Sequence, residues 1–202
     1  MKKHITLIAA VIGIASGASF AQTTPDTPTR AETDVQRNAN QQERIEQGLQ
    51  SGQLNTKEAG KLEKEQAHID TMEKRDLRNG KISAKEQAKL NAAQNKASAD
   101  ITAQKHDAQT GNPDSASSKR MQADVQRNAD QQTRIEQGMK SGELTNREAG
   151  SLEKGQAKVD RTEARAARNG HVTAREQAKV EATENRQSKR VHHKKHNDTE
   201  KQ

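Results

Sequence analysis

The stretch Gly52-Gln53-Leu54-Asn55-Thr56-Lys57-Glu58 decides how this chain folds. Glycine suits the left-handed backbone position that ends a helix. Asn55 and Glu58 have the spacing of a capping box, in which each of the two side chains accepts a hydrogen bond from a free backbone N–H of the next helix. The stretch therefore predicts that one helix ends, the chain turns sharply, and another helix begins at once.

The same junction occurs four times. Its glycines are Gly52, Gly80, Gly142 and Gly170, and each lies three residues before a capping box, with an apolar residue between them: the boxes are Asn55/Glu58, Ser83/Glu86, Thr145/Glu148 and Thr173/Glu176. The junctions and the 3.6-residue apolar periodicity predict helices at about 34–49, 55–78, 83–105, 124–139, 145–168 and 173–195. Because the connections are short, neighbouring helices should be antiparallel.

The two halves of the chain are copies of each other. The segment Asp34-Val35-Gln36-Arg37-Asn38-Ala39 recurs at 124–129. Over a longer range, 38 of the 68 positions from 34 to 101 are identical in 124–191 without a gap. We therefore divide the chain into domains according to this duplication. The expected division is a signal peptide (1–21), a disordered lead-in (22–33), helical repeat 1 (34–107), a linker (108–123), helical repeat 2 (124–197) and a disordered tail (198–202).

The composition restricts the fold to helices. Hydrophobic residues make up 28% of the chain, which has one Phe and no Trp, Tyr or Cys. A sheet needs β-branched and aromatic residues that are scarce here. We therefore expect an all-α protein, built as two tandem three-helix modules or helical hairpins that gain order by packing on each other or in a homo-oligomer.

Polar residues interrupt the apolar face of the helix expected at 55–78. Gln66 and Glu73 lie on this face, and Gln156 and Glu163 match them in the second copy. They indicate either a loosely packed, partly hydrated interface or a polar device that sets register or contacts a partner. Other carboxylates of this helix, such as Glu63, are expected on the solvated surface.

The N-terminus has the pattern of an export signal. Met1 to His4 is a short basic segment, Ile5 to Ala18 is apolar, and Ser19-Phe20-Ala21 offers small residues for cleavage. We expect cleavage near Ala21 and a periplasmic or secreted mature protein. Without cysteine, this protein has no disulfides to stabilise it.

Two segments are similar to the second half of an EF-hand calcium loop. In Arg75 to Glu86, glycine occupies position 6 and glutamate position 12 of the loop, and 165–176 repeats the pattern. Position 1 is an arginine in both segments, where calcium needs a carboxylate, so helix capping explains these residues better. The candidate calcium ligands of this degenerate loop are Asn79, Ser83, Glu86, Asn169, Thr173 and Glu176.

A second candidate metal site lies near the C-terminus. His192 and His196 are four residues apart, with His193 beside them, and such a pair can hold zinc or copper. The first copy retains only His106 of these three. We favour the alternative of a cationic helix end, since positive side chains suit the negative end of the helix dipole.

The positive charge is concentrated near the C-terminus. The chain carries +7 overall, and residues 186–202 hold six basic and two acidic residues. The candidate polyanion-binding residues are Arg186, Lys189, Arg190, Lys194 and Lys195, with an anionic membrane surface as the partner. Nucleic acid is not expected as a partner, because export separates the protein from the genome and no aromatic ring is left to stack on bases.

No motif for catalysis is present. The chain has no cysteine nucleophile, no nucleophile elbow and no glycine-rich phosphate loop. We therefore expect a non-enzyme without a cofactor, and three hypotheses remain open. The first and main one is a structural or protein-interaction module of the cell envelope, with an unknown envelope protein as partner. The others are a metal-binding protein, through calcium loops or the histidines, and a polyanion or membrane-surface binder through the basic tail.

As a whole, the duplicated helical chain with its export signal resembles the small exported, internally duplicated helical proteins of Gram-negative bacteria. This resemblance implies no activity.

Overall fold

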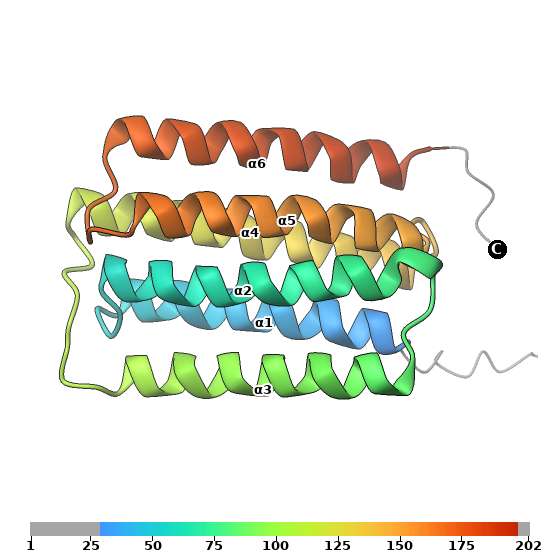
Figure 1. Ribbon diagram of the computed structural model, residues 1–202. Coiled ribbons are helices and arrows are strands. Elements are labelled where there is room, and N and C mark those ends of the chain that lie inside the picture. Colours follow the sequence, from blue (N-terminus) through green and yellow to red (C-terminus); the bar gives the residue numbers. More distant parts are fainter. Residues whose placement is uncertain (1–28, 198–202) are drawn as a thin grey trace, which may run out of the picture.

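The computed structural model describes residues 29–197, which form a bundle of helices (Figure 1). The helices are α1 (Arg30–Gln50), α2 (Thr56–Asp76), α3 (Ala84–Lys105), α4 (Ala116–Lys140), α5 (Asn146–Ala166) and α6 (Ala174–Lys195), and the short 3-10 helix η1 (Leu77–Asn79) follows α2. The predicted all-α class is confirmed. The predicted signal peptide, most of the lead-in and the tail 198–202 lie outside the described residues. Between residues 29 and 197, no helix combines the length and apolarity that membrane crossing requires.

The predicted junctions are present in the structure. All four junction glycines have positive φ angles, from 72° at Gly52 to 84° at Gly170. In the first capping box, Glu58 N donates to Asn55 Oδ1 and Asn55 N donates to Glu58 Oε2, both at 3.0 Å. The other three boxes are formed in the same way. As a result, α2, α3, α5 and α6 begin and end within two residues of the predicted positions.

Two helices begin earlier than predicted. A fifth capping box, between Thr29 and Glu32, starts α1 inside the predicted lead-in. Ser115 accepts a hydrogen bond from Ser118 N and starts α4 inside the predicted linker. Burial then stabilises the added turns, since Ala31 and Met121 are at most 3% exposed. The prediction began each copy at the repeated segment, and both caps lie upstream of it.

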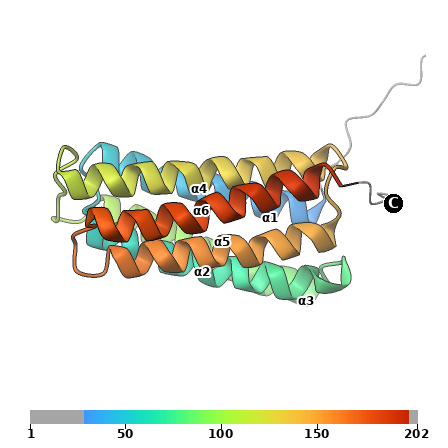
Figure 2. The ribbon, with the colours of Figure 1, turned by 90° about the horizontal axis from the view of Figure 1, so that it is seen from above.

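The main helix contacts join one copy to the other. α2 packs chiefly on α5, and α1 on α4, so these four helices form the centre of the bundle. α3 covers α1 and α2 on one side, and α6 covers α4 and α5 on the opposite side (Figures 1 and 2). The three helices of each copy therefore lie together, and the two copies pack face to face through α1 and α2 on one side and α4 and α5 on the other.

The apolar core is shared between the copies. One cluster combines Ile45 and Leu62 of the first copy with Val125 and Val180 of the second. Another cluster likewise draws on both copies. The expected packing of the modules on each other is present, whereas two separate tandem modules are not confirmed.

α2 and α5 approach each other closely at two glycines. A Cβ atom at Gly60 would lie 2.6 Å from the Cβ of Ala167, and a Cβ at Gly150 would lie 2.7 Å from the Cβ of Leu77. Both distances are shorter than any van der Waals contact, so only glycine permits this spacing. Because Leu77 and Ala167 are equivalent positions of the repeat, exchanging the copies converts one contact into the other. The two copies are thus related by an approximate two-fold axis.

This close approach predicts a large effect of substituting Gly60. Gly60→Val should force α2 and α5 apart and lower the free energy of unfolding by about 1–3 kcal/mol, the usual cost of overpacking. Urea denaturation followed by circular dichroism would measure the change. Lys61→Val is the matched control, because it places the same side chain on the exposed face one residue along. Equal losses in the two variants would contradict the prediction.

Candidate cation site in the bundle core

Six carboxyl side chains lie at the centre of the bundle, between α2 and α5. Each helix contributes three at the same spacing, which places them on one helical face. They are Glu63, Asp70 and Glu73 of α2, and Glu153, Asp160 and Glu163 of α5. None is more than 1% exposed. The expectation that Glu63 lies on the solvated surface is therefore wrong, because the packing of α5 and α1 on α2 covers this face.

The six carboxyls form two equivalent groups. Glu63 joins Asp160 and Glu163 in one group, and the other contains Glu153, Asp70 and Glu73. Each group thus takes one residue from one copy and two from the other. One oxygen from each of the three residues lies within 4.8 Å of the others. Oxygen ligands 2.3–2.6 Å from a calcium-sized ion are at most about 5 Å apart, so this spacing fits a single ion.

Glutamine side chains from α1 and α4 contact both groups. Gln42 Nε2 donates to Glu63 Oε2 at 3.0 Å, and Gln132 Nε2 donates to Glu153 Oε2 at 3.2 Å. The Oε1 atoms of both glutamines are buried without a hydrogen-bond partner. Each amide is therefore held against a carboxyl group while its oxygen remains available. A side-chain carbonyl oxygen is a ligand of the kind that calcium takes besides carboxylates.

Asparagines complete the surroundings of the two groups. Asn38 Nδ2 donates to Glu73 Oε2 at 2.8 Å, and Asn128 Nδ2 donates to Asp160 Oδ1 at 2.6 Å. The polar residues Gln66 and Gln156, noted on the apolar face, are also buried and bond to side chains of α1 and α4. The side chains outside the cluster that donate hydrogen bonds to the six carboxyls are all amides, and none of the ion pairs found in residues 29–197 includes one of the six.

Burial raises the pKa of all six carboxyls. The main cause is removal from water, which disfavours the charged form, and most of the six also feel repulsion from neighbouring carboxylates. The pKa rises to about 8 for Glu63 and Glu153, to about 7 for Asp160, and well above its ordinary value for Asp70, Glu73 and Glu163.

The carboxyls also contact one another in pairs. Three pairs are close enough to share a proton: Glu63 with Glu163, Asp70 with Asp160, and Glu73 with Glu153. Since Asp70 and Asp160 belong to different groups, their contact joins the two groups into one continuous cluster. Without such shared protons, each of the six side chains has one buried oxygen that no donor reaches. The cluster therefore needs either protons or cations to be stable in the core.

The EF-hand-like residues serve as helix caps in the structure. Ser83 N donates to Glu86 Oε2 at 2.9 Å, and Asn79 Oδ1 accepts a hydrogen bond from Lys81 N at 3.0 Å. Asn169, Thr173 and Glu176 make the same contacts in the second copy. Neither loop belongs to a group of three potential metal ligands within the described range. These oxygens satisfy backbone N–H groups at the start of α3 and α6.

The histidines close the end of α6. The rings of His192 and His196 stack with centroids 4.4 Å apart, and His196 Nδ1 lies 2.8 Å from the carbonyl oxygen of His192. His106 makes the same contact with Thr102 at the end of α3. His193 is exposed beside the pair. In each copy, one ring nitrogen of the histidine at this helix end, His106 or His196, is thus already engaged by a backbone carbonyl.

Three of the five candidate polyanion-binding residues contact the bundle itself. Arg190 donates to the carbonyl oxygen of Ser151 at 2.7 Å, Lys195 Nζ lies 3.1 Å from Glu143, and Lys194 Nζ lies 3.9 Å from Glu148. The other two, Arg186 and Lys189, are exposed on α6. The structure therefore does not bring the five together as one exposed surface.

Sequence reasoning missed most of the carboxyl cluster, although a signal for it was present. Glu63, Asp70 and Glu73 have identical counterparts in the second copy, whereas the exposed His68 and Thr71 on the same helix do not. Comparison of the chain with protein-family models, curated proteins and solved structures gave no match. The function therefore has to be inferred from the site.

The raised pKa values predict that the cation-free protein loses stability as the pH rises. Between the ordinary carboxyl pKa of about 4 and the folded pKa of about 8 for Glu63, the folded state holds more protons than the unfolded state. The free energy of unfolding should therefore fall from pH 5 to pH 8.5. Urea denaturation in the presence of a chelator would measure it.

A double variant tests the source of this pH dependence. Glu63→Gln with Glu153→Gln removes two of the titrating groups while keeping side-chain size, and should flatten the profile. Glu43→Gln, on the exposed face of α1, is the control and should leave the profile unchanged. A wild-type protein that is equally stable at both pH values would contradict the assignment.

Proposed function

We propose that this chain is a non-enzymatic, exported cation-binding protein that holds ions of the calcium, manganese or lanthanide type in the core of its helical bundle. The observation that carries the proposal is the cluster of six carboxyls, buried without a lysine or arginine ion-paired to them among residues 29–197 and arranged in two groups with ion-sized spacing.

Electrostatics supports a charged occupant. Each ionised carboxylate loses several kcal/mol of hydration when it enters a protein core, and the loss is repaid only by a close opposite charge. Protons satisfy this need at low pH. At the neutral or higher pH where the groups ionise, bound cations would replace the protons. The cluster is therefore suited to exchange protons for metal ions.

The donor atoms favour hard cations. Both groups offer only oxygen, from carboxyls and from the amides of Gln42 and Gln132. Oxygen ligands suit calcium, magnesium and manganese, whereas zinc and copper prefer the nitrogen and sulfur ligands that are missing here. Three carboxylates carry three negative charges, so a trivalent ion would neutralise each group completely. A divalent ion would leave one charge, or one bound proton, at each group.

This proposal replaces the other two metal-site hypotheses and ranks above the interaction-module hypothesis. The oxygens of Ser83 and Glu86 already cap α3, and His196 already contacts the end of α6. A protein-interaction module is supported by no comparable feature, because the apolar clusters of both copies are used inside the bundle. The carboxyls are at most 1% exposed, so a substrate would not reach an ion bound there. This burial supports a binding role without catalysis.

Titration with metal ions tests the proposal. Isothermal titration calorimetry of the mature protein with Ca²⁺, Mn²⁺ and Tb³⁺ at pH 8 should show two ions bound per chain for at least one of them, with release of protons. The melting temperature should rise at the same time, because an ion that binds only the folded state stabilises it. Absence of binding by all three ions would refute the proposal.

Variants locate the site. Glu63→Gln with Glu153→Gln should weaken binding at least about tenfold, because each ion loses one charged ligand. Glu86→Gln with Glu176→Gln, and His192→Ala with His196→Ala, are matched controls for the loop and histidine alternatives, and should bind as the wild type does. If either control abolished binding while the core variant retained it, the ions would not lie in the core.

A further inference from the structure

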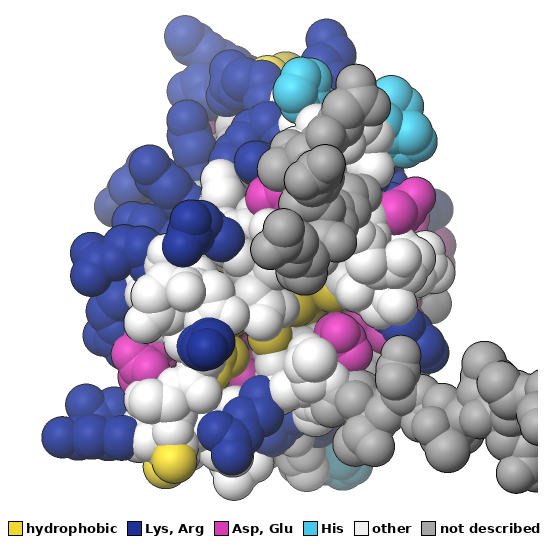
Figure 3. Space-filling view, turned by 90° about the vertical axis from the view of Figure 1, so that its right-hand side faces the viewer, with side chains coloured by type: hydrophobic (Ala, Val, Ile, Leu, Met, Phe, Trp, Pro, Cys, Tyr) yellow, Lys and Arg dark blue, Asp and Glu magenta, His cyan; other side chains and the backbone are white. Residues whose placement is uncertain are grey.

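One side of the bundle is covered with positive side chains. It is the side formed by α2 and α5, which Figure 3 shows as the left-hand edge, with Lys and Arg along its height. The exposed cations of these helices, of η1 and of the turn after α5 are Lys57, Lys61, Lys64, Lys74, Arg75, Arg78, Arg147, Lys154, Lys158, Arg161, Arg165 and Arg168. We call this surface the basic face.

Acidic side chains of the same helices do not balance this charge. Most of them are turned into the core, including the six of the cluster. Asp76 is also buried, but it forms an ion pair with Arg75 of this face at 2.7 Å. Of the two that are not buried, Glu148 caps α5 and Glu65 lies 3.2 Å from Lys96 of α3. The arrangement that collects carboxylates inside the bundle therefore leaves α2 and α5 strongly basic outside.

The opposite side of the bundle has a different character. The exposed residues along the middle of α1 and α4 are mostly uncharged amides, with a few acids, and they include Gln36, Asn40, Glu43, Gln126 and Asp130. The exposed cation there, Arg127, is ion-paired with Glu184 at 3.0 Å. Charge is thus segregated between two faces of one molecule. Such segregation orients a protein toward a negatively charged surface.

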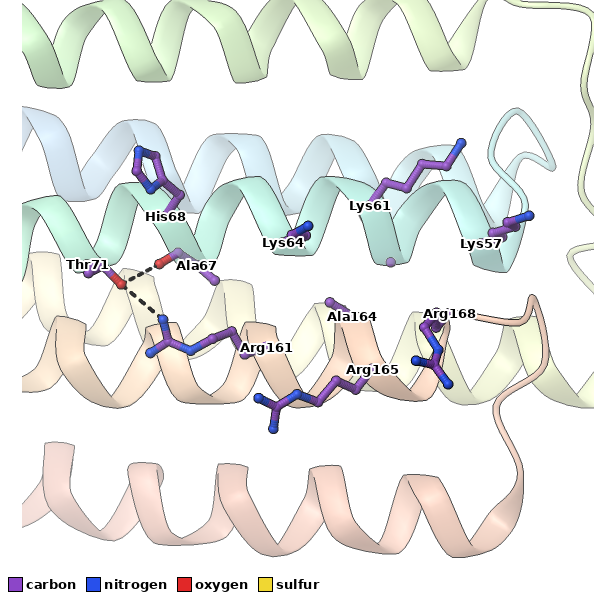
Figure 4. Close-up of a pocket in the computed structure, with 11 residues that line it drawn as sticks. Lys57, Lys61, Lys64, Ala67, His68, Thr71, Arg161, Ala164, Arg165 and Arg168 are labelled. Carbon is purple, nitrogen blue, oxygen red and sulfur yellow. Dashed lines mark hydrogen bonds between the residues drawn. The ribbon is translucent and has the colours of Figure 1, made fainter.

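The basic face has a shallow groove along the seam between α2 and α5. A groove of about 710 Å³ lies between Lys61 and Lys64 on one helix and Arg161 and Arg165 on the other (Figure 4). Its floor is made of the small residues Gly60, Ala67 and Ala164. None of its lining residues is acidic.

The approximate two-fold symmetry produces a second groove at the other end of the seam. It has a volume of about 610 Å³, and its lining includes Gly150, Lys154 and Arg147 of α5, Arg75 of α2 and Arg78 of η1. The basic face therefore offers two similar anion-binding recesses on one side of the protein, rather than one deep pocket for a small molecule.

We infer that the basic face binds the phosphate groups of an anionic lipid membrane. Lysine and arginine side chains near a membrane attract anionic headgroups, and clusters of four to eight suffice for recognition. The long apolar stems of these side chains flank the small-residue floor, while the charged ends extend outward. The lining of the two grooves includes no large apolar side chain besides Met72, so adsorption rests on charge.

The breadth of the basic face favours a membrane over a single strand of nucleic acid. Lysine and arginine side chains lie along two neighbouring helices, α2 and α5, and this distribution matches a broad, planar array of phosphates. Binding of single strands usually adds aromatic rings that stack on bases, and the only aromatic residue of the chain is Phe20. The basic face shares no residue with the proposed cation site.

Sedimentation with lipid vesicles tests the inference. The mature protein should bind vesicles that contain phosphatidylglycerol and should lose this binding at high salt. It should not bind vesicles of pure phosphatidylcholine. Lys61→Gln with Lys64→Gln and Lys154→Gln should weaken vesicle binding at least about tenfold. Circular dichroism should show unchanged helicity, because all three side chains are exposed.

A second triple variant supplies the control. Lys119→Gln with Lys140→Gln and Lys189→Gln removes the same charge from exposed positions on α4 and α6, and should change binding by less than about twofold. Equal losses in the two variants would overturn the inference, because overall charge would then suffice. So would wild-type protein that binds duplex DNA but not anionic vesicles. Metal titration of the first variant should match the wild type, which separates this inference from the cation site.

Discussion

The burial of six carboxyl groups between α2 and α5 is the constraint on which the rest of the structure depends. Buried carboxyls are tolerated only where hydrogen-bond donors and neutralising protons or cations surround them. The amides of α1 and α4 supply the donors, so these helices must lie against α2 and α5 on the other side. Because each carboxyl group draws on both copies, neither copy could satisfy its polar residues alone. The polar cluster therefore requires the face-to-face packing of the two repeats.

Packing at the seam allows this polar core to exist. Gly60 and Gly150 let α2 and α5 approach closely, which brings carboxyls of one helix within reach of those on the other. Apolar clusters lie at each end of the bundle, with Leu49 and Leu62 in one and Ile135 and Leu152 in the other. A low content of large apolar residues is therefore sufficient to fill the core, because hydrogen-bonded amides and carboxyls occupy the middle of the bundle.

The same two helices account for both the inner and the outer surface. On α2, the face that carries Glu63 and Asp70 is covered by other helices, and the face that carries Lys61 and Lys64 meets solvent. An overall count of charges hides this separation, since acids and bases nearly cancel in the body of the chain. Two opposite chemistries thus follow from one amphipathic pattern: a cation-attracting core and an anion-attracting face.

The sequence by itself determined the helices, their junctions and the duplication. Glycine followed by a capping box acts through backbone geometry and hydrogen bonds within a few residues, so these features need no tertiary information. Only the tertiary structure decided which polar residues lie inside. Glu63 and Lys61 belong to the same charge-rich helix, and the burial of Glu63 depends on residues of α5, ninety positions away in the repeat. Long-range packing alone converts such a pattern into a buried cluster, because the energetic effect of a carboxylate depends on what surrounds it.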